Sequence, residues 1–180
     1  MSECETIAES SAIYLDASAL AKIDIEEDAS SRLVRILIYL SRIPVYCSLV
    51  GFGEFVSVAG KKLTQARIGS AGYLYGCRAL LVDLEMGKLR LVEPVADRFQ
   101  FIREAEDILS RHASLGGGDL WHIMAARQLA KDHVPATLFT FDRDLVEAAA
   151  AEGLRAVSGF AVDPEALVRE LTSKGMWVPA

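Results

Sequence analysis

Short apolar runs alternate with amphipathic segments along the chain. The apolar, β-prone runs predict strands at 12–15, 45–47, 89–92, 136–140 and 155–157. Apolar residues at helical spacing predict helices that begin after Asp16 and at 26–41, 48–60, 63–86, 95–112, 119–130, 143–152 and 165–172. Strands that alternate with helices favour a parallel sheet that is covered by helices. We therefore expect an α/β fold with a central, mostly parallel sheet.

The pattern also predicts how the chain is divided. Residues 1–10 are expected to form a flexible tail, residues 11–160 one domain, and residues 161–180 a C-terminal helix and tail. Length agrees, because 180 residues suit a single domain with a sizeable core.

Four details of the helices are specific enough to check. The 63–86 helix should break near Gly69 or Gly72, and residues 116–118, three consecutive glycines, should form a flexible joint. Gly153 should end a helix in the left-handed conformation. The 95–112 helix should turn Phe99, Ile102, Ala105 and Leu109 toward the core.

Two segments share one order of elements, in which a strand is followed by an acid and then by a helix. Asp16 follows the 12–15 run, and Asp142 follows the 136–140 run. If these strands are parallel neighbours, both acids lie at the carboxyl edge of the sheet, where open α/β sheets bind ligands. The simpler alternative is that each aspartate only caps its helix.

Two further acids stand out. Glu54 is the one charge in the apolar 48–60 segment, and Asp119 opens a helix directly after the glycines. Solvent exposure could explain Glu54, and helix capping could explain Asp119. Three or four carboxylates brought to one edge would repel each other, and a divalent cation would resolve this. Their hard oxygen ligands suit Mg²⁺ or Mn²⁺, and no His or Cys cluster argues for zinc.

Composition narrows the functional classes. Hydrophobic residues make up 52% of the chain, and no apolar stretch reaches the roughly 18 residues that a membrane span needs. The acidic start lacks the features of a signal peptide, so we expect a cytoplasmic protein. The formal net charge is −6, so binding of nucleic acid would need a local basic patch or bound metal ions. Cys4, Cys47 and Cys77 match no zinc or redox spacing, and we expect Cys47 and Cys77 to be buried apolar residues.

Four motifs together resemble the PIN-domain nucleases. They are Tyr-Leu-Asp16-Ala-Ser18-Ala-Leu, the segment from Ser48 to Glu54, Gly-Asp119-Leu-Trp-His-Ile-Met-Ala-Ala, and Thr140-Phe-Asp142-Arg-Asp144-Leu. Their order and spacing are similar to those of the toxins of VapBC-type toxin–antitoxin pairs. The resemblance covers about residues 11–158, and its last two motifs are the most specific.

The resemblance implies a three-layer α/β/α fold and a metal-dependent endoribonuclease that acts on RNA. Asp16, Glu54, Asp119 and Asp142 would hold one or two Mg²⁺ or Mn²⁺ ions. A small antitoxin protein would be the partner, and we also expect a homodimer with no membrane association.

Supporting roles are open for three further residues. The hydroxyls of Ser18 and Thr140 could bond a ligand carboxylate or a metal-bound water, although a plain helix-start or strand-end role is simpler. Asp144 could replace or assist Asp142, or could be a first-turn acid that interacts with the helix dipole.

The remaining candidates have ordinary explanations. His122 lies one helical turn after Asp119 and could touch phosphate, but a packing or surface role is simpler. The candidate phosphate contacts, for which a solvated surface is the alternative, are Lys61, Lys62, Arg67 and Arg143. Trp121 and Trp177 are expected in the core or at an interface.

Rival interpretations are a receiver domain, a haloacid-dehalogenase-type phosphatase, a non-catalytic PIN-fold binding module and a housekeeping RNA-processing PIN nuclease. The first needs an adjacent acidic pair after the first strand, and the second needs an Asp where Ser18 stands. The other two share the fold, and the four acids argue against the non-catalytic module.

Overall fold

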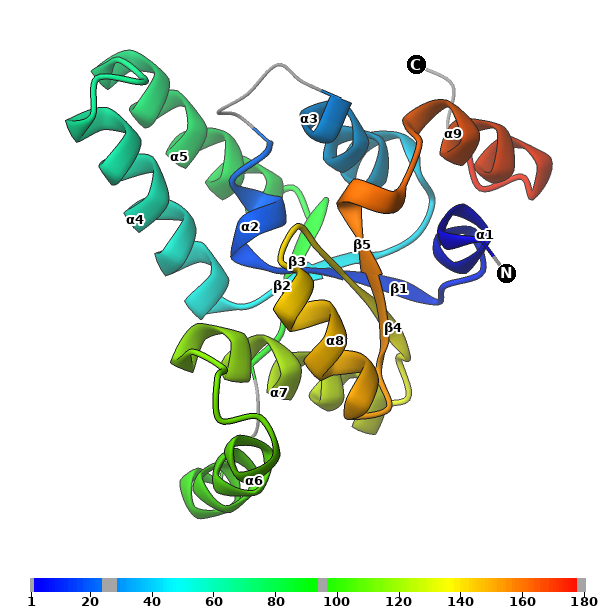
Figure 1. The fold of residues 1–180 in the computed structure, drawn as a ribbon. Coiled ribbons are helices and arrows are strands. Elements are labelled where there is room, and N and C mark those ends of the chain that lie inside the picture. The colour runs from blue at the N-terminus through cyan, green and yellow to red at the C-terminus, as the bar shows by residue number, and fades with distance from the viewer. Residues whose placement is uncertain (1, 24–28, 94–96, 178–180) are drawn as a thin grey trace.

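All five strands belong to one parallel sheet. The computed structural model describes residues 2–23, 29–93 and 97–177. The strands are β1 (Ala12–Leu15), β2 (Val45–Cys47), β3 (Leu89–Leu91), β4 (Ala136–Thr140) and β5 (Arg155–Ser158), and they lie in the order β3-β2-β1-β4-β5 (Figure 1). The expected parallel α/β architecture is confirmed. Because β1 pairs directly with β4, the segments that follow these two strands are brought together.

Helices cover both faces of the sheet. Their bounds are α1 (Glu3–Ala8), α2 (Ala17–Leu20), α3 (Ala29–Arg35), α4 (Leu49–Thr64), α5 (Ser70–Glu85), α6 (Arg98–Arg111), α7 (Gly117–Lys131), α8 (Arg143–Ala151) and α9 (Pro164–Ser173). A π-helical turn, Ile36–Leu40, continues α3, and a short 3₁₀ turn, Gly159–Ala161, follows β5.

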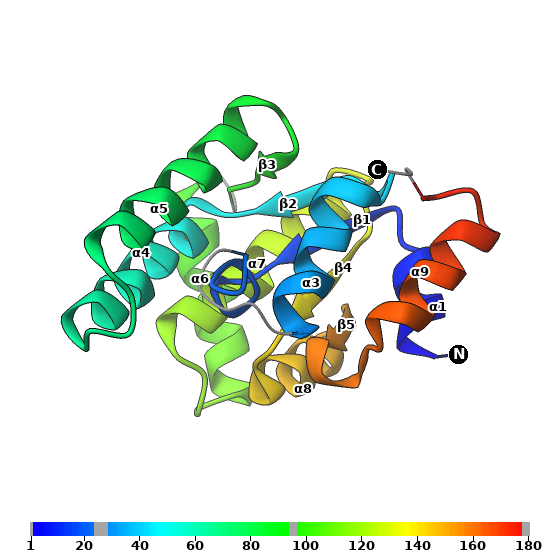
Figure 2. The ribbon, with the colours of Figure 1, turned by 90° about the horizontal axis from the view of Figure 1, so that it is seen from above.

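Alternation along β1 divides the core into two halves. Ile13 and Leu15 point into a cluster built with α1 to α5 and α9, whereas Ala12 and Tyr14 point into a cluster built with α6, α7 and α8. Figure 1 shows the sheet between these helical layers, and Figure 2 shows α4 and α5 side by side at one end and α1 beside α9 at the other. This is the three-layer arrangement that the motifs imply.

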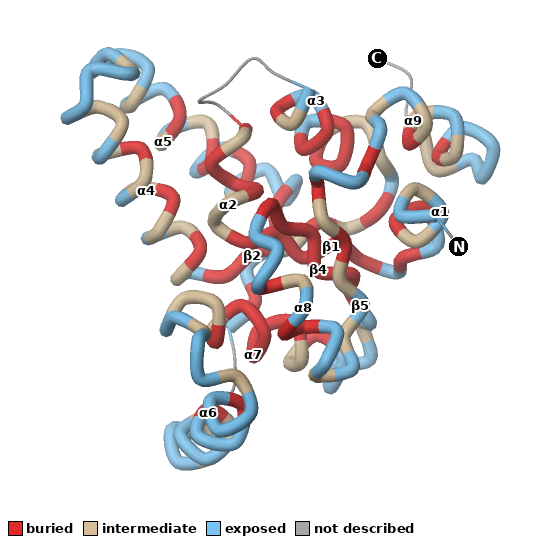
Figure 3. Tube along the Cα trace, in the orientation of Figure 1, coloured by how far each residue is buried: buried red, intermediate tan, exposed pale blue. Residues whose placement is uncertain are grey.

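The structure corrects two expectations about helices. The first ten residues contain α1, which Ser2 and Glu5 stabilise with a capping box and which buries Ile7 and Ala8 against α9 and β5, where the pattern predicted a loose tail. The predicted inner face of α6 is largely outside the core, because Phe99, Ile102 and Leu109 are exposed (Figure 3). Apolar spacing alone does not reveal whether a neighbouring element exists to cover a face.

Two of the predictions about glycines are confirmed and one is wrong. Gly69 caps α5 and Gly153 has φ +75°, so both the helix break and the left-handed helix end are confirmed. Residues 116–118 are not a joint, because α7 begins at Gly117 and includes Gly118. Residues 26–28 and 95–96, which begin two predicted helices, lie outside the described residues.

Two smaller predictions can also be compared. Cys47 is buried as expected, while Cys77 is only half-buried. Within the described ranges, no helix is both long and apolar enough to cross a membrane.

Candidate active site

Asp16 is the most tightly held acid at the carboxyl edge of the sheet. It follows β1, caps α2 through the Ala19 N–H, and is only 3% exposed. Ser18 donates to its Oδ1 at 2.9 Å and Thr140 donates to its Oδ2 at 2.7 Å. Burial raises the pKa of Asp16, while the nearby His122 and these hydrogen bonds oppose the rise. The carboxylate is therefore fixed in position before any ligand arrives.

Ser18 and Thr140 connect the two strand–acid–helix segments. The Phe141 N–H donates to Ser18 Oγ at 2.8 Å, and the Asp142 N–H donates to Thr140 Oγ1 at 2.9 Å. Each hydroxyl thus donates to Asp16 and accepts from the segment that follows β4. The two residues orient a site carboxylate in addition to their local roles.

Glu54 reaches the same region from α4, where its side chain is 40% exposed. Its Oε2 lies 3.0 Å from Nε2 of His122, which is buried and whose Nδ1 lies 2.8 Å from the Tyr14 hydroxyl. The simpler expectation for His122, a packing or surface role, omits these two polar contacts. The sequence shows that His122 lies one helical turn from Asp119, which points toward the site. Its partner Glu54 on α4 cannot be identified from the local sequence.

Asp119 lies in the first turn of α7 and accepts a hydrogen bond from the Gly116 N–H at 3.1 Å. Burial raises its pKa, the Gly116 N–H opposes that rise, and the nearby carboxylates of Asp142 and Glu54 add to it. The last contribution shows that these acids sense one another's charge.

Asp142 caps α8, and its Oδ1 accepts hydrogen bonds from the N–H groups of Asp144 and Leu145 at 2.9 and 3.2 Å. Three of the acids therefore stand at helix N-termini, on α2, α7 and α8. Partial positive charge at these termini favours negative side chains and offsets part of their repulsion.

All four acids line one cleft of about 330 Å³. Its lining consists of Asp16, Ala17, Ser18, Glu54, Ser57, Val58, Lys61, Asp119, His122 and Asp142. Four expected residues fall outside it. Asp144 lines a separate hollow beside His112, and Lys62, Arg67 and Arg143 are not among the lining residues.

The donor set fits a hard divalent cation in its chemistry, because four carboxylates line one cleft. Within the described ranges, no three Asp, Glu, His or Cys side chains are drawn together as a metal-ligating group. Each outer acid instead uses one oxygen for a hydrogen bond within the protein, and no hydrogen bond from a described residue falls on Glu54 Oε1, Asp119 Oδ1 or Asp142 Oδ2. Like charges repel one another in the absence of a counter-ion, which agrees with this separation.

A larger hollow, of about 870 Å³, lies between α3 and α9. Its acids are already used, because Glu165 pairs with Arg32 and Asp163 caps α9. Apolar side chains such as Ile36, Leu40 and Trp177 make up much of the remaining lining. The smaller cleft is therefore the better candidate for chemistry.

A five-stranded parallel sheet in the order β3-β2-β1-β4-β5, covered by helices and carrying acids beyond β1 and β4, has the arrangement of a PIN-domain fold. Solved structures share it. FitAcB from Neisseria gonorrhoeae aligns with a TM-score of 0.54 and 18% identity over 83% of this chain and 99% of that chain. FitAB bound to an IR36 DNA fragment aligns with a TM-score of 0.56 and 17% identity over 83% of this chain and 96% of that chain.

PAE2754 from Pyrobaculum aerophilum gives a TM-score of 0.50 and 20% identity over 90% of this chain and 97% of that chain. No protein-family model and no curated protein matches the sequence. At these identities the similarity shows the fold alone, and the side chains of the cleft are the evidence for its chemistry.

Proposed function

We propose that the protein is a Mg²⁺- or Mn²⁺-dependent ribonuclease that hydrolyses phosphodiester bonds in this cleft. The observation that carries the proposal is the presence of Asp16, Glu54, Asp119 and Asp142 in one lining, delivered by four different segments of the chain. When bound, the divalent ion would lower the pKa of a water ligand and stabilise charge on the leaving oxygen.

The chain's own groups divide the work between fixed and adjustable ligands. Asp16 supplies a carboxylate that three hydrogen bonds hold still. Glu54, Asp119 and Asp142 each keep one oxygen on a donor within the protein, and the other oxygen has no hydrogen bond from a described residue. These carboxylates would hold the ion and orient its water, and none of them would need to attack the substrate.

Lys61 gives the cleft a cation near the acids. It lies two helical turns beyond Glu54 on α4 and is exposed at the cleft lining. Its ammonium can pair with a phosphate oxygen of the RNA backbone, a contact that positions the substrate without reading its sequence.

Substitution of Asp142 tests the proposal with the fold preserved. Asparagine is also a good N-cap, so Asp142→Asn should keep α8 while removing one anionic ligand. RNA cleavage in Mg²⁺ should fall to the level of wild type in EDTA. Asp144→Asn is the matched control, because it lies two residues away outside the cleft and should cleave like wild type.

Two outcomes would redirect the assignment. Equal cleavage by Asp142→Asn and wild type would remove the cleft from catalysis. Absence of both Mn²⁺ binding and cleavage in the wild type would favour a non-catalytic binding module.

We also propose a small antitoxin partner that inhibits this site. FitAB, which shares the fold, is bound to a DNA fragment in its solved structure. A cleft lined by carboxylates attracts a guanidinium, whose planar fork can bond a carboxylate through two N–H groups. Coexpression with the flanking gene should yield a complex with reduced activity, and Mn²⁺ should compete with the partner's basic residue. Recovery of no partner, with harmless overexpression of the active protein, would favour housekeeping RNA processing.

A further inference from the structure

A buried chain of polar groups leads from β1 to Glu54 at the cleft. The Tyr14 hydroxyl lies 2.8 Å from Nδ1 of His122, and Nε2 of His122 lies 3.0 Å from Glu54 Oε2. Tyr14 is fully buried, the His122 side chain is 2% exposed, and their rings meet edge to face at 5.8 Å. This series of polar groups runs from the sheet through α7 to α4.

Two glycines leave room for these polar side chains where α4 contacts α7. A Cβ atom on Gly51 of α4 would lie 3.2 Å from Cε1 of His122 on α7. Reciprocally, a Cβ atom on Gly118 of α7 would lie 1.9 Å from Oε1 of Glu54 on α4. Each helix thus presents a glycine to the polar side chain of the other, and that close fit restricts where the glutamate can lie.

The proton positions follow from the partners. If Glu54 is ionised, it can only accept, so Nε2 of His122 must carry the proton that it donates. In a neutral imidazole, Nδ1 then accepts, and the Tyr14 O–H donates to it. Each ring nitrogen of His122 then has a suitable partner.

We propose that Tyr14 and His122 are positioning residues that hold Glu54 ready to bind a divalent cation, a role that rests on the proposed function of the cleft. A partly exposed glutamate is otherwise mobile, and ordering it in advance lowers the entropic cost of binding an ion. The hydrogen bond to His122 takes Oε2 and leaves Oε1, which lies against Gly118, without a hydrogen bond from a described residue. Tyr14 acts through His122, because it sets which imidazole nitrogen donates.

Mn²⁺ titration of the full chain by calorimetry tests this role. Removing a group that orients a metal ligand typically weakens binding by about 10–100-fold, which is the expected loss for His122→Leu. Tyr14→Phe should weaken binding less, because only the hydroxyl is lost. His122→Gln can place an amide N–H near the position of Nε2 and should recover most of the affinity.

A matched control exists for the tyrosine. Tyr46 pairs with Tyr14 in register on β2, and its hydroxyl accepts from Arg90, so Tyr46→Phe should leave Mn²⁺ affinity unchanged. Thermal unfolding in EDTA checks that each variant is folded. In the metal-free wild type, the ¹⁵N shifts of the His122 imidazole should report a proton on Nε2, the nitrogen that faces Glu54.

The outcomes separate the two proposals. If the wild type binds no Mn²⁺, the proposed function fails and the inference fails with it. If the wild type binds Mn²⁺ but His122→Leu and Tyr14→Phe bind equally well, the inference alone is overturned. An Nδ1-protonated tautomer would also overturn it.

Discussion

Gly118 and Glu54 face each other across the α4–α7 contact with no room for a methyl group between them. A Cβ atom on Gly118 would lie 1.9 Å from Glu54 Oε1 and 2.8 Å from its carboxyl carbon. The obstructing atoms belong to the end of a flexible, partly exposed side chain, so the glutamate can yield while the helices stay in place. The glycine therefore governs the position of a carboxylate more than the stability of the fold.

Gly118→Ala should consequently lower Mn²⁺ affinity and RNA cleavage with little loss of thermal stability. Gly117→Ala is the matched control, because a Cβ atom there meets nothing within 4 Å and the residue lies in the same helical turn. Alanine is a better helix former than glycine by up to about 1 kcal/mol, so the control should be as stable as wild type or slightly more stable. Calorimetric titration of both variants makes the comparison, and equal affinities would contradict a role for Gly118 at the site.

Asp119→Asn should raise the melting temperature in EDTA. Burial and the neighbouring carboxylates raise the pKa of Asp119, so its ionised form is unfavourable in the folded state. Asparagine keeps an oxygen that can accept from the Gly116 N–H, so the local hydrogen bond can persist. In saturating Mn²⁺ the order should reverse, because the wild type gains more from binding.

The pH dependence of that difference has a definite sign. A carboxyl group with a raised folded-state pKa favours the fold below its unfolded pKa, and this advantage is lost as pH rises through the folded value. The melting temperature of Asp119→Asn should therefore rise relative to that of wild type as pH increases from about 4 toward neutrality, because the pKa of an unfolded Asp is about 3.9. Melting curves in EDTA across that range check it, and a shift that is constant with pH would point to an effect unrelated to charge.

Thr140→Val should destabilise the metal-free protein, whereas Thr140→Ser should largely preserve stability. The Thr140 hydroxyl donates to buried Asp16 and accepts from the Asp142 N–H. Valine keeps the volume but removes both hydrogen bonds, and loss of one to a charged group costs about 1.5–3 kcal/mol. Urea unfolding at neutral pH measures the cost. Equal stability of the valine and serine variants would show that the hydroxyl does not support Asp16.

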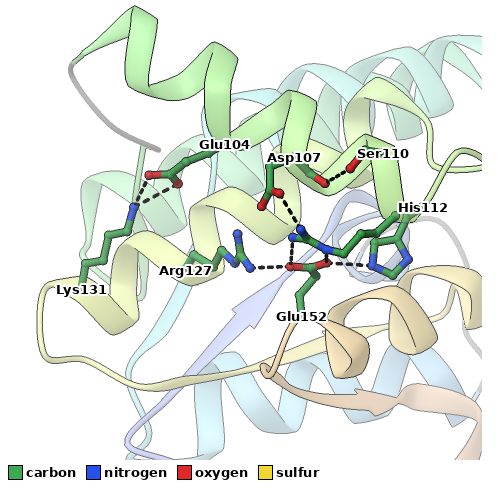
Figure 4. Close-up of polar contacts among 8 residues, drawn as sticks. Glu104, Asp107, Ser110, His112, Arg127, Lys131 and Glu152 are labelled. Atoms are coloured by element: carbon green, nitrogen blue, oxygen red, sulfur yellow. Dashed lines mark hydrogen bonds and ion pairs between the residues drawn. The ribbon is translucent and has the colours of Figure 1, made fainter.

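Glu152→Gln should loosen the attachment of α6. Glu152 ends α8 and accepts from Arg111 and His112 at the end of α6, and it pairs with Arg127 of α7 (Figure 4). Its side chain is 3% exposed, and the Arg111 hydrogen bonds in particular lower its pKa to about 2. A carboxyl group with a lowered folded-state pKa stabilises the fold at pH values above its unfolded pKa, here by up to about 3 kcal/mol. This stabilisation is lost as pH falls from about 4.5 toward 2.

Hydrogen exchange of α6 amides at pH 7 should therefore be faster in Glu152→Gln. The exposed Glu106→Gln on α6 serves as the control and should exchange like wild type. The melting temperatures of wild type and Glu152→Gln should converge as pH falls through the same window. A difference that persists at pH 2 would assign the effect to packing.

Lys61→Ala should raise KM for RNA with little change in kcat. The ammonium stands at the cleft lining, where a phosphate contact would add binding in the ground state and transition state alike. Lys88→Ala, an exposed lysine before β3, is the control. Loss of one phosphate contact should also reduce the dependence of log KM on log salt by close to one unit. An unchanged salt slope would place the RNA elsewhere.

The parts of the cleft that local sequence reveals are those set by local structure. Asp16 and Asp142 could be predicted because each follows a strand and starts a helix. Parallel pairing of β1 with β4 then brings the two acids to the same edge of the sheet. The meeting of Glu54 with His122 depends instead on the separation of α4 and α7. Gly51 and Gly118 leave room at that contact for the side chains of His122 and Glu54, and in the sequence Gly51 indicates only a poor helix residue.

The same limit explains the incorrect prediction for α6. Its apolar spacing is amphipathic, but Phe99 and Ile102 have no covering element among the described residues. Conversely, α1 was missed because the stability of a six-residue helix comes from its cap and from α9, which lies at the far end of the sequence.

The central pairing of β1 with β4 also governs when the site can exist. Asp16 and Thr140 are 124 residues apart in sequence, so most of the chain must be synthesised before the hydroxyl can meet the carboxylate. Contacts of such long range form late in folding, since the entropy of closing the loop is lost before the contact compensates it. A nascent chain on the ribosome therefore presents separated acids and no assembled cleft until β4 has emerged. Synthesis itself delays the appearance of the complete site.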